Sequence, residues 1–381
     1  MKVISAEEVH ASLSYPQLID SLQEAYGGSY SMPPRQVFLL DENKGNDAFA
    51  VLPSWNEELI GVKAFTYFPG AEEPYKSLYS KVLLFNRDHG EPLALVDGTT
   101  VTFWRTAGIS GLATRLLSRE DSETMLLLGT GNLASYIIKA NLSVRSLKKV
   151  MVWGRNLEKA KSVIDSVSVE YPDVQFEAIE DRAAACAEAD IVVAATGSHE
   201  PVVLGQWIKP GTHTDFIGNH HADKRECDTE LIKKAKVYAD SRVNAFKEAG
   251  EILVPISEGS FTEEGVVAEL SEMCNGKALL RENEDEITLF KSIAGGLSWH
   301  DALLPLSDVH GAWVIVFICY ILITTFAVLN VITGVFCESA MEAADNDRDL
   351  ALQKHMSKRK RSKKRSRRSK RSGPSRRSRR S

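Results

Sequence analysis

Residues 125–134 read MLLLGTGNLA, four apolar residues that run into the pattern G-x-G-x-x-A. In such a motif the first glycine permits a tight turn, and the second lets a pyrophosphate approach the backbone. The closing alanine allows a helix to pack closely on the strand, and the first turn of that helix offers free N–H groups to phosphate. The motif therefore predicts a dinucleotide site rather than a glycine-rich turn without a ligand. The cofactor contacts predicted from it are Gly129, Thr130, Gly131, Asn132 and Leu133.

The chain that follows the motif alternates between strand-like and helical stretches. The near-continuous apolar runs are MLLLG, KKVMVWG, VQFEAI, DIVVAAT, HTDFIG and KVYAD, and sequence with helical periodicity separates them. Strands that are apolar along their whole length are typical of a parallel sheet buried on both faces. The fold class predicted for residues 119–291 is thus α/β, a doubly wound parallel sheet that binds a dinucleotide.

The chain before the motif has a different pattern. Residues 6–28 read as one helix closed by a pair of glycines. The β-rich runs VFLL, FAVLP, LIGVKAFTYF, SKVLLFN and PLALVDG follow, with a hairpin turn at residues 87–90, and a second helix is predicted over residues 99–117. These features predict an α+β domain over residues 1–118, built on an antiparallel sheet.

The strand after the motif indicates which dinucleotide is bound. Enzymes that prefer NAD usually carry Asp or Glu at the end of this strand, about 20 residues beyond the glycines, to bind the ribose 2′-hydroxyl. Here the strand ends in Val152-Trp153-Gly154-Arg155-Asn156, with no carboxylate and with an arginine suited to a 2′-phosphate. We therefore predict NADP as the cofactor. NAD is the alternative, in which Arg155 is only a solvated surface charge.

Three basic residues stand at the edges of predicted elements in the N-terminal domain, namely Arg35, Lys63 and Arg105. Arginine binds a carboxylate through a bidentate fork, and lysine adds a compact point charge. Singly, each residue is better explained as a surface charge. Together they predict a clamp for the carboxylate of a small substrate.

Five motifs in a fixed order resemble the ornithine cyclodeaminase/mu-crystallin family, from the start of the chain to about residue 291. They are PPR, GVK, DGTT with RTA, GTGNLA and KPGTH. The resemblance implies an NAD(P)-dependent oxidoreductase of a small amino acid or its imine, a homodimer whose β domain joins a dinucleotide-binding domain. It also implies that Arg35, Lys63 and Arg105 hold the substrate carboxylate against the nicotinamide. The resemblance further implies that Thr196 and Ser198 border the cofactor.

Two departures from the family pattern bear on the reaction. Where the cyclodeaminases carry a catalytic Asp two residues beyond a glycine, this chain has His220, and a family Glu near the substrate aligns with Ala50. Family members that only reduce imines, such as mu-crystallin, also lack the Asp. The resemblance therefore favours reduction of a ketimine, of the pyrroline-2-carboxylate type, over cyclodeamination of ornithine to proline and ammonia. Lys63 and His220 are the candidate proton donors; the alternative for His220 is a loop histidine without a role.

Cysteine usage and the N-terminus predict a reducing, cytoplasmic compartment for the enzyme body. The chain has five cysteines, an odd number without a C-x-x-C pair, and its polar first residues do not form a secretory signal. The group His213, His220, His221 and Cys227 has no structural zinc spacing, so no metal is predicted. A non-catalytic ligand-binding protein that keeps the dinucleotide fold is the alternative to an enzyme.

The C-terminal part differs in character. Residues 292–345 resemble the pore loop and last pore-lining helix of a voltage-gated cation channel. Residues 292–310 would be a linker like the pore loop, and residues 311–337, uncharged and mostly apolar, are long enough for a single transmembrane helix. Residues 338–381 are predicted to be a disordered basic tail. From Lys354 on, the tail has 16 Lys or Arg and no Asp or Glu, which leaves 30 basic and 51 acidic residues in the rest of the chain.

This C-terminal part predicts a single-pass, membrane-associated chain, and as an alternative function a membrane-anchored or channel-derived fusion protein. Its basic tail is suited to bind RNA or anionic lipid. The positive-inside tendency would keep the tail cytoplasmic and place the enzyme body across the membrane, which conflicts with the predicted compartment. Three interpretations resolve the conflict: the tail is translocated, the apolar segment does not span the membrane, or the chain joins two unrelated coding pieces. We favour the last.

Overall fold

The computed structural model describes residues 1–33, 36–40, 47–219 and 221–292. The linker predicted beyond residue 292, the predicted transmembrane helix at 311–337 and the basic tail lie outside the described residues. Among the helices of the described ranges, none is both long enough and apolar enough to cross a membrane.

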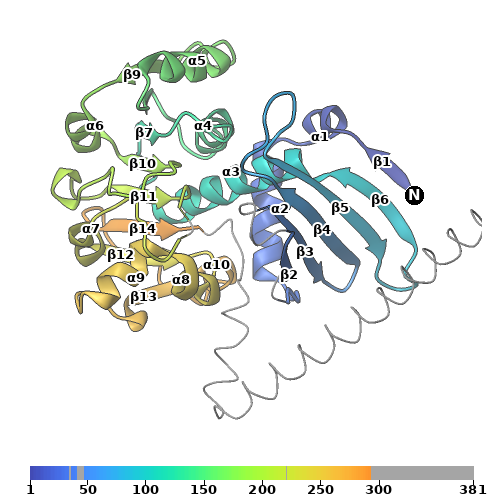
Figure 1. The fold of residues 1–381 in the computed structure, drawn as a ribbon. Coiled ribbons are helices and arrows are strands. Elements are labelled where there is room, and N and C mark those ends of the chain that lie inside the picture. The colour runs from blue at the N-terminus through green and yellow to red at the C-terminus, as the bar shows by residue number, and fades with distance from the viewer. Residues whose placement is uncertain (34–35, 41–46, 220, 293–381) are drawn as a thin grey trace, which may run out of the picture. The chain divides into compact units, whose positions relative to one another are not determined.

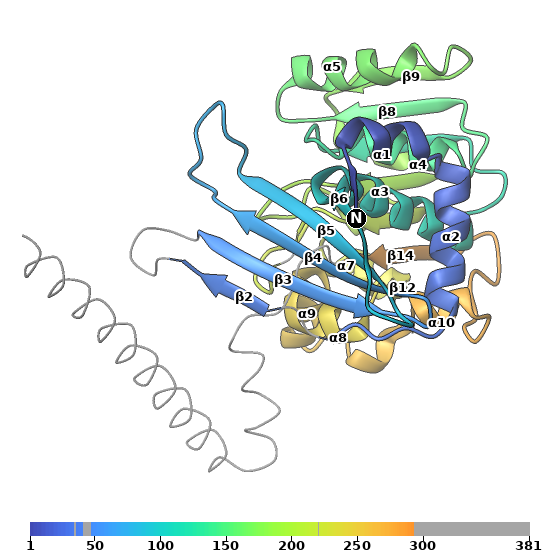
Figure 2. The ribbon, with the colours of Figure 1, turned by 90° about the vertical axis from the view of Figure 1, so that its right-hand side faces the viewer.

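The N-terminal half contains a six-stranded sheet with helices on one face (Figures 1 and 2). Its elements are β1 (Lys2–Ile4), α1 (Ala6–Ser12), α2 (Tyr15–Gly27), β2 (Gln36–Leu39), β3 (Ala48–Trp55), β4 (Leu59–Tyr67), β5 (Leu78–Asn86), β6 (Pro92–Asp97) and α3 (Gly98–Leu117). The strand order is β1-β6-β5-β4-β3-β2, and all neighbours are antiparallel except β1 and β6. The predicted antiparallel sheet is confirmed, as is the hairpin between β5 and β6, where Gly90 adopts φ +73°.

The predicted single helix over residues 6–28 is wrong, because the chain forms two helices there. α1 ends at Ser12 and α2 begins at Tyr15, and Leu13 and Ser14 between them have extended backbone. Pro16 in the first turn of α2 explains the break. Proline has no N–H to donate to a preceding turn, so it is tolerated at the start of a helix and not in its interior.

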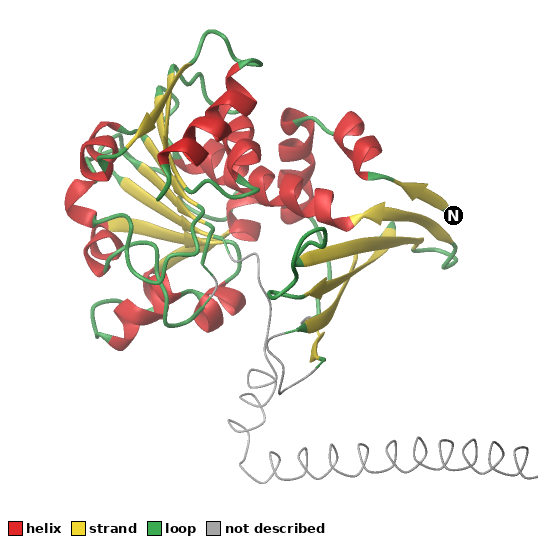
Figure 3. Cartoon of the chain, turned by 45° about the horizontal axis from the view of Figure 1, so that its top comes forward, coloured by secondary structure: helices red, strands yellow, loops and turns green. Residues whose placement is uncertain are grey.

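The C-terminal half contains an eight-stranded sheet with helices on both faces (Figures 1 and 3). Its strands are β7 (Thr124–Leu128), β8 (Lys149–Trp153), β9 (Gln175–Ile179), β10 (Ile191–Ala194), β11 (His213–Phe216), β12 (Ala235–Ala239), β13 (Val266–Glu269) and β14 (Ile287–Lys291). Its helices are α4 (Ala134–Leu142), α5 (Leu157–Ser168), α6 (Arg182–Glu188), α7 (Thr229–Lys234), α8 (Arg242–Glu248), α9 (Gly250–Ser257) and α10 (Leu270–Cys274), with short 3-10 turns η1 (Gly205–Trp207) and η2 (Glu263–Gly265).

Every pair of neighbouring strands in this second sheet is parallel, which confirms the predicted α/β class. The strand order is β13-β12-β14-β11-β10-β7-β8-β9. β7, β8 and β9 follow one another toward one edge, and the chain then returns to place β10 on the other side of β7. Ligands of doubly wound sheets bind at such a reversal, beyond the carboxyl ends of the strands. The G-x-G-x-x-A motif stands at this point, directly after β7.

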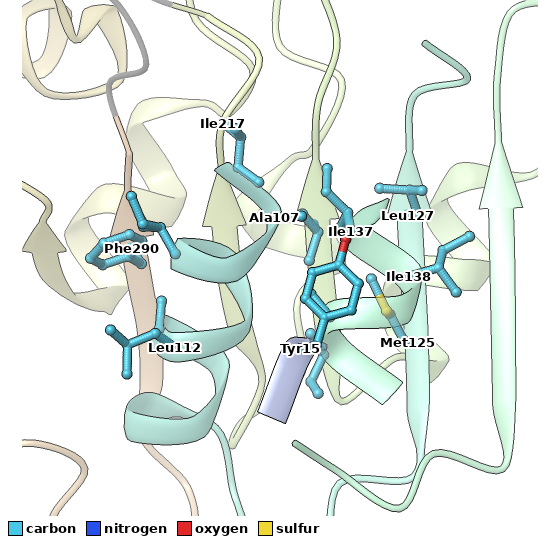
Figure 4. Packing of buried hydrophobic residues seen from close by; sticks show 14 of the residues in the cluster. Tyr15, Ala107, Leu112, Met125, Leu127, Ile137, Ile138, Ile217 and Phe290 are labelled. Carbon is cyan, nitrogen blue, oxygen red and sulfur yellow. The ribbon is translucent and has the colours of Figure 1, made fainter. Parts of the chain in front are cut away.

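Helix α3 packs against both sheets and contributes residues to the main hydrophobic core (Figure 4). Ala107 and Leu112 from α3 belong to this core together with Leu127 from β7, Ile137 from α4 and Phe290 from β14, all buried. The same helix contacts β4, β5 and β6 of the first sheet and β11 of the second. Residues carried by α3 are therefore fixed relative to both sheets.

Candidate active site

Two glycines after β7 form a tight turn with open space above it. Gly129 adopts φ +129°, and a Cβ there would lie 2.4 Å from the carbonyl oxygen of Ala195, so both backbone conformation and space require glycine. A Cβ on Gly131 would have no heavy atom within 4 Å in the described part of the chain, its immediate neighbours aside. This space lets a phosphate group approach the backbone at the start of α4.

A cavity of about 310 Å³ opens beside this turn. The predicted cofactor residues that line it are Gly129, Thr130, Gly131, Arg155, Thr196 and Ser198. The cavity is also lined by six residues that were not predicted to contact the cofactor, namely Trp153, Gly154, Lys159, Ala195, Gly197 and Val202. Asn132 and Leu133 lie in the turn that leads into α4, outside this lining. Most of the predicted cofactor residues therefore meet at the carboxyl ends of β7, β8 and β10.

The end of the cavity beyond β8 is cationic. Arg155 and Lys159 are both exposed there, the first just after β8 and the second in the first turn of α5. Arg182 stacks on Trp153, with its Cζ 4.7 Å from the ring centroid, and donates from Nη1 to the carbonyl oxygen of Val202 at 3.3 Å. Lys159 is not among the predicted cofactor residues, although a second cation four residues after Arg155 is a usable signal for a phosphate.

These observations fit a pyridine dinucleotide. The open glycine turn at the start of α4 suits a pyrophosphate, because N–H groups and the helix dipole both favour anions there. The cationic end beyond β8 suits the phosphate-bearing adenosine side. The loop after β10, which carries Thr196 and Ser198, lies on the opposite side of β7 and suits the nicotinamide half.

Lys63 lies on β4 and faces helix α3. Its Nζ donates to Oγ1 of Thr102 at 2.7 Å and lies 5.7 Å from the centroid of the Phe65 ring. Thr102 donates in turn to the carbonyl oxygen of Gly98 at 2.6 Å. Residues three apart share a helix face, so Arg105 lies on the same side of α3 as Thr102. Sheet and helix thus bring two of the three predicted clamp residues toward one region.

Arg105 lies close to residues from two further elements. Burial lowers the pKa of its guanidinium, while Tyr26 of α2 and Asp240, the residue after β12, raise it. The N–H of Asp240 donates to the carbonyl oxygen of Lys291 at 3.0 Å, at the carboxyl end of the parallel sheet. A guanidinium stays protonated at all pH values that proteins tolerate. Arg105 therefore carries a fixed positive charge that Tyr26 and Asp240 stabilise.

Two predicted site residues, Arg35 and His220, lie outside the described residues, and the roles assigned to them stay predictions. Ala50, the position that aligns with a family Glu, is fully buried on β3 and pairs with Phe65 of β4. That position supplies no carboxylate to a substrate.

Two buried titratable residues on β11 have partners within the core. The Nδ1 of His213 lies 2.9 Å from Oγ1 of Thr288, and burial lowers the pKa of the imidazole to about 3. Asp215 accepts a hydrogen bond from Oγ of Ser110 at 2.5 Å, and burial raises the pKa of its carboxyl to about 7. His213 is thus a neutral core residue. Across the ranges the structure describes, no group of three or more His, Cys, Asp or Glu residues is placed to hold a metal ion.

Comparison with known proteins finds relatives along most of the chain. A model described as the ornithine cyclodeaminase/mu-crystallin family matches residues 1–309. The match runs past residue 291, where the predicted resemblance to the family ends, and includes nearly all of the segment 292–310. The resemblance of that segment to a channel pore loop is therefore unsupported.

Two of the relatives are Δ1-pyrroline-2-carboxylate reductases. The protein of Colwellia psychrerythraea is 50% identical over 302 residues, which covers 78% of this chain and 96% of the relative. That of Paracoccus denitrificans is 33% identical over 295 residues, covering 77% and 92%. Among solved structures, Thermococcus litoralis Δ1-pyrroline-2-carboxylate reductase in complex with NADH and L-proline matches with a TM-score of 0.72 at 33% identity, covering 80% of this chain and 94% of that one.

Proposed function

We propose a substrate for this protein from the premise that the chain belongs to the ornithine cyclodeaminase/mu-crystallin family. The protein is an NAD(P)-dependent imine reductase of that family. Its proposed substrate is a small cyclic ketimine carboxylate of the pyrroline-2-carboxylate type. The observation that carries this choice is the 50% identity to the Colwellia reductase, which extends over 96% of that protein.

The residues of the chain have two tasks in the proposed reaction, to hold the carboxylate and to protonate the imine nitrogen. The bound dinucleotide supplies the hydride. Arg105, together with the predicted Arg35, is proposed to grip the substrate carboxylate and so to align the adjacent imine carbon. Lys63, whose ammonium is oriented by Thr102, is the proposed proton donor, and His220 is the second candidate.

Cyclodeamination of ornithine is the alternative reaction. This reaction removes a hydride and later returns it, and between these steps ammonia is lost and the ring closes. It therefore requires a further acid or base beside the substrate. Ala50 supplies none, and the position of the catalytic Asp in the cyclodeaminases carries His220. Both departures support reduction.

We also propose NADP as the preferred dinucleotide. A 2′-phosphate on the adenosine ribose would lie at the cationic end of the cavity, between Arg155 and Lys159. Neither side chain would have such a partner in NAD. NAD stays the alternative, since the Thermococcus structure contains NADH.

The outer face of the N-terminal sheet supports a homodimer. Because Lys63 faces α3, its neighbours Val62 and Ala64 face away from the helices. The residues opposite them in the sheet register are Pro53, Leu83 and Val51, with Lys81 at the margin. In the part of the chain that the structure describes, helices α1 to α3 cover only the other face (Figure 2). An apolar sheet face of this kind suits a second copy of the chain.

One assay on the purified full chain tests the proposed reaction. Pyrroline-2-carboxylate with NADPH or NADH should lead to loss of the absorbance of the reduced nicotinamide and to formation of proline. Ornithine with NAD should release no ammonia. Ammonia from ornithine would assign cyclodeamination instead, and dinucleotide binding without turnover of either compound would assign a non-catalytic binding protein.

A further inference from the structure

A fully buried carboxylate, Glu226, ties together the loops that follow two neighbouring strands. Its Oε1 accepts hydrogen bonds from the N–H and the Oγ1 of Thr196, at 2.6 and 2.7 Å, in the loop after β10. Its Oε2 accepts from the N–H of Gly218 at 2.8 Å, in the loop after β11. One side chain thus satisfies donors from both loops, although it lies in neither strand.

The two loops are also in direct backbone contact. A Cβ on Gly218 would lie 2.1 Å from the carbonyl oxygen and 2.2 Å from the nitrogen of Thr196, so only glycine permits this approach. Thr196, Gly197 and Ser198 line the dinucleotide cavity on its nicotinamide side. A change in the hydrogen bonds between Glu226 and these loops would therefore shift residues that line the proposed nicotinamide side of the cavity.

A second set of buried contacts connects the backbone of Glu226 to the loop after β10 by another route, referred to below as the circuit. Its backbone N–H donates to Oε1 of Glu251 at 3.0 Å, and Oε2 of Glu251 lies 3.0 Å from Nζ of Lys291. Lys291 donates to the carbonyl oxygen of Asn219 at 2.6 Å, and the side-chain amide of Asn219 donates to the carbonyl oxygen of Ser198 at 3.0 Å. The circuit returns to the loop after β10.

The hydrogen-bond donors around position 226 favour a carboxylate there. Glu226, Glu251 and Lys291 are all fully buried, so each ionised group needs partners inside the protein. Burial raises the pKa of Glu226 above its usual range, and the neighbouring Glu251 adds to this effect, while Lys291 and the hydrogen bonds from Thr196 oppose it. Only an ionised carboxylate accepts at both oxygens, whereas an amide would turn N–H donors toward the N–H of one of the loops.

We propose that Glu226 is a positioning residue, which holds the loops after β10 and β11 in the arrangement that receives the nicotinamide half of the dinucleotide. This inference rests on the proposed function for its choice of ligand. The side chain of Glu226 acts through Thr196 and Gly218, while its backbone carbonyl oxygen, which the variants below leave in place, accepts from the N–H groups of Val202 and Val203.

The test compares Glu226→Gln with a matched control, Asp190→Asn. Asp190 is also buried and also accepts two backbone N–H groups, from Glu123 and Thr124, but at the amino end of β7. Calorimetric titration of each full-chain variant with NADPH and with 2′-phosphorylated ADP-ribose (ADP-ribose below), which is NADPH without its nicotinamide, separates the two ends of the cavity. Glu226→Gln should weaken NADPH binding by roughly 10-fold or more and leave ADP-ribose binding unchanged. Asp190→Asn should leave both unchanged in protein that is folded by circular dichroism.

Equal weakening of NADPH and ADP-ribose by Glu226→Gln, or no weakening of either, would overturn the inference. Should Glu226→Gln fail to fold, Glu226→Asp provides the same test, because it keeps the charge but is too short to reach both loops. The expected result is again weaker NADPH binding with ADP-ribose unaffected. Because the readout is binding, a wild-type protein that binds NADPH but does not turn over the imine would contradict the proposed function and leave this test intact.

Discussion

Arg105 supplies a fixed positive charge where the substrate carboxylate is proposed to bind. Arg105→Lys keeps the charge but loses the bidentate fork, and Arg105→Ala loses both. We therefore expect kcat/KM for the imine to fall roughly 10-fold in the first variant and on the order of 1000-fold in the second. Affinity for the dinucleotide should not change, because Arg105 does not line the cavity beside Gly129. Steady-state kinetics and calorimetry measure the two quantities.

Arg115 provides a control on the same helix. It pairs with Asp20 of α2 at 2.6 Å and with Gln23, outside the candidate site. Arg115→Lys should leave kcat/KM close to the wild-type value. If Arg115→Lys lowered kcat/KM as much as Arg105→Lys does, the loss would come from disturbing α3 in general. The clamp role of Arg105 would then be wrong.

Arg155 and Lys159 should decide the choice between NADP and NAD. Replacing either residue with alanine removes a charge-assisted contact to a 2′-phosphate, so the ratio of kcat/KM for NADPH to that for NADH should fall roughly 10-fold. Lys161→Ala is the matched control, since Lys161 lies exposed on the same helix and pairs with Glu158. A ratio that stays constant in the Arg155 and Lys159 variants would point to NAD as the natural cofactor.

Site residues differ in how far sequence predicts them. Gly129 and Arg155 each belong to a short continuous sequence pattern. In each pattern the residue type at that position has a clear chemical explanation. Glu226 has no such signal, because its partners Thr196 and Glu251 are 30 and 25 residues away along the chain, and Gly218, eight residues away, belongs to no pattern with it. Only the folded sheet, in which β10 and β11 are neighbours, brings those residues together.

The helices and strands were predictable where one physical pattern dominates. Buried parallel strands are apolar along their length, and this marks β7, β8 and β10 clearly. The break between α1 and α2 was missed because the apolar spacing continues across it while Pro16 interrupts the hydrogen bonds. The place of β14 between β11 and β12 also escapes a reading along the chain, since strand order depends on contacts between distant segments.

The turn between β7 and α4 leads to a prediction that separates binding from folding. A methyl group on Gly131 meets no atom of the described protein but occupies the space proposed for the pyrophosphate. Gly131→Ala should therefore keep or slightly raise the melting temperature and weaken dinucleotide binding. Gly129→Ala should instead lower the melting temperature, because its backbone has φ +129° and its Cβ would meet Ala195. If Gly131→Ala bound the dinucleotide with wild-type affinity, this turn would not be part of the binding site.

Asp215 predicts how the stability of the whole protein depends on pH. Burial raises the pKa of its carboxyl from the ordinary 3.8 to about 7, so between these values the folded protein holds a proton that the unfolded chain has released. This group therefore lowers the free energy of unfolding as pH rises from 4 to 7, by at most about 1.4 kcal/mol per pH unit. His213, whose pKa burial lowers to about 3, has the opposite effect below pH 6.5.

Asp215→Asn removes the first of these effects and leaves the second. The difference in the free energy of unfolding, variant minus wild type, should rise from pH 5 to pH 7 and then level off. Urea denaturation at several pH values measures it. The pKa of Asp190 lies below its usual range, so Asp190→Asn should show a difference that is flat over the same interval. A flat difference for Asp215→Asn would show that its carboxyl is already ionised at pH 5.

The outer face of the N-terminal sheet predicts the oligomeric state. Val62→Glu places a charge in the middle of that face, and we expect it to convert the proposed homodimer to a monomer in light-scattering measurements. Val169→Glu is the control, because Val169 is 85% exposed and lies far along the chain, after α5. A wild-type protein that is monomeric, or a Val62→Glu variant that stays dimeric, would contradict the proposed interface.

Helix α3 has a consequence for motion. It runs unbroken over Gly98–Leu117, carries Arg105, and packs against strands of both sheets, so the domain boundary predicted at residue 118 falls at the end of a shared element. In enzymes whose halves are joined by pliable linkers, substrates enter as the halves swing apart. Here such a movement would break the packing of the continuous helix α3 against one of the two sheets. Substrate entry and product release should then depend on local movements of loops rather than on a change in the distance between the two sheets.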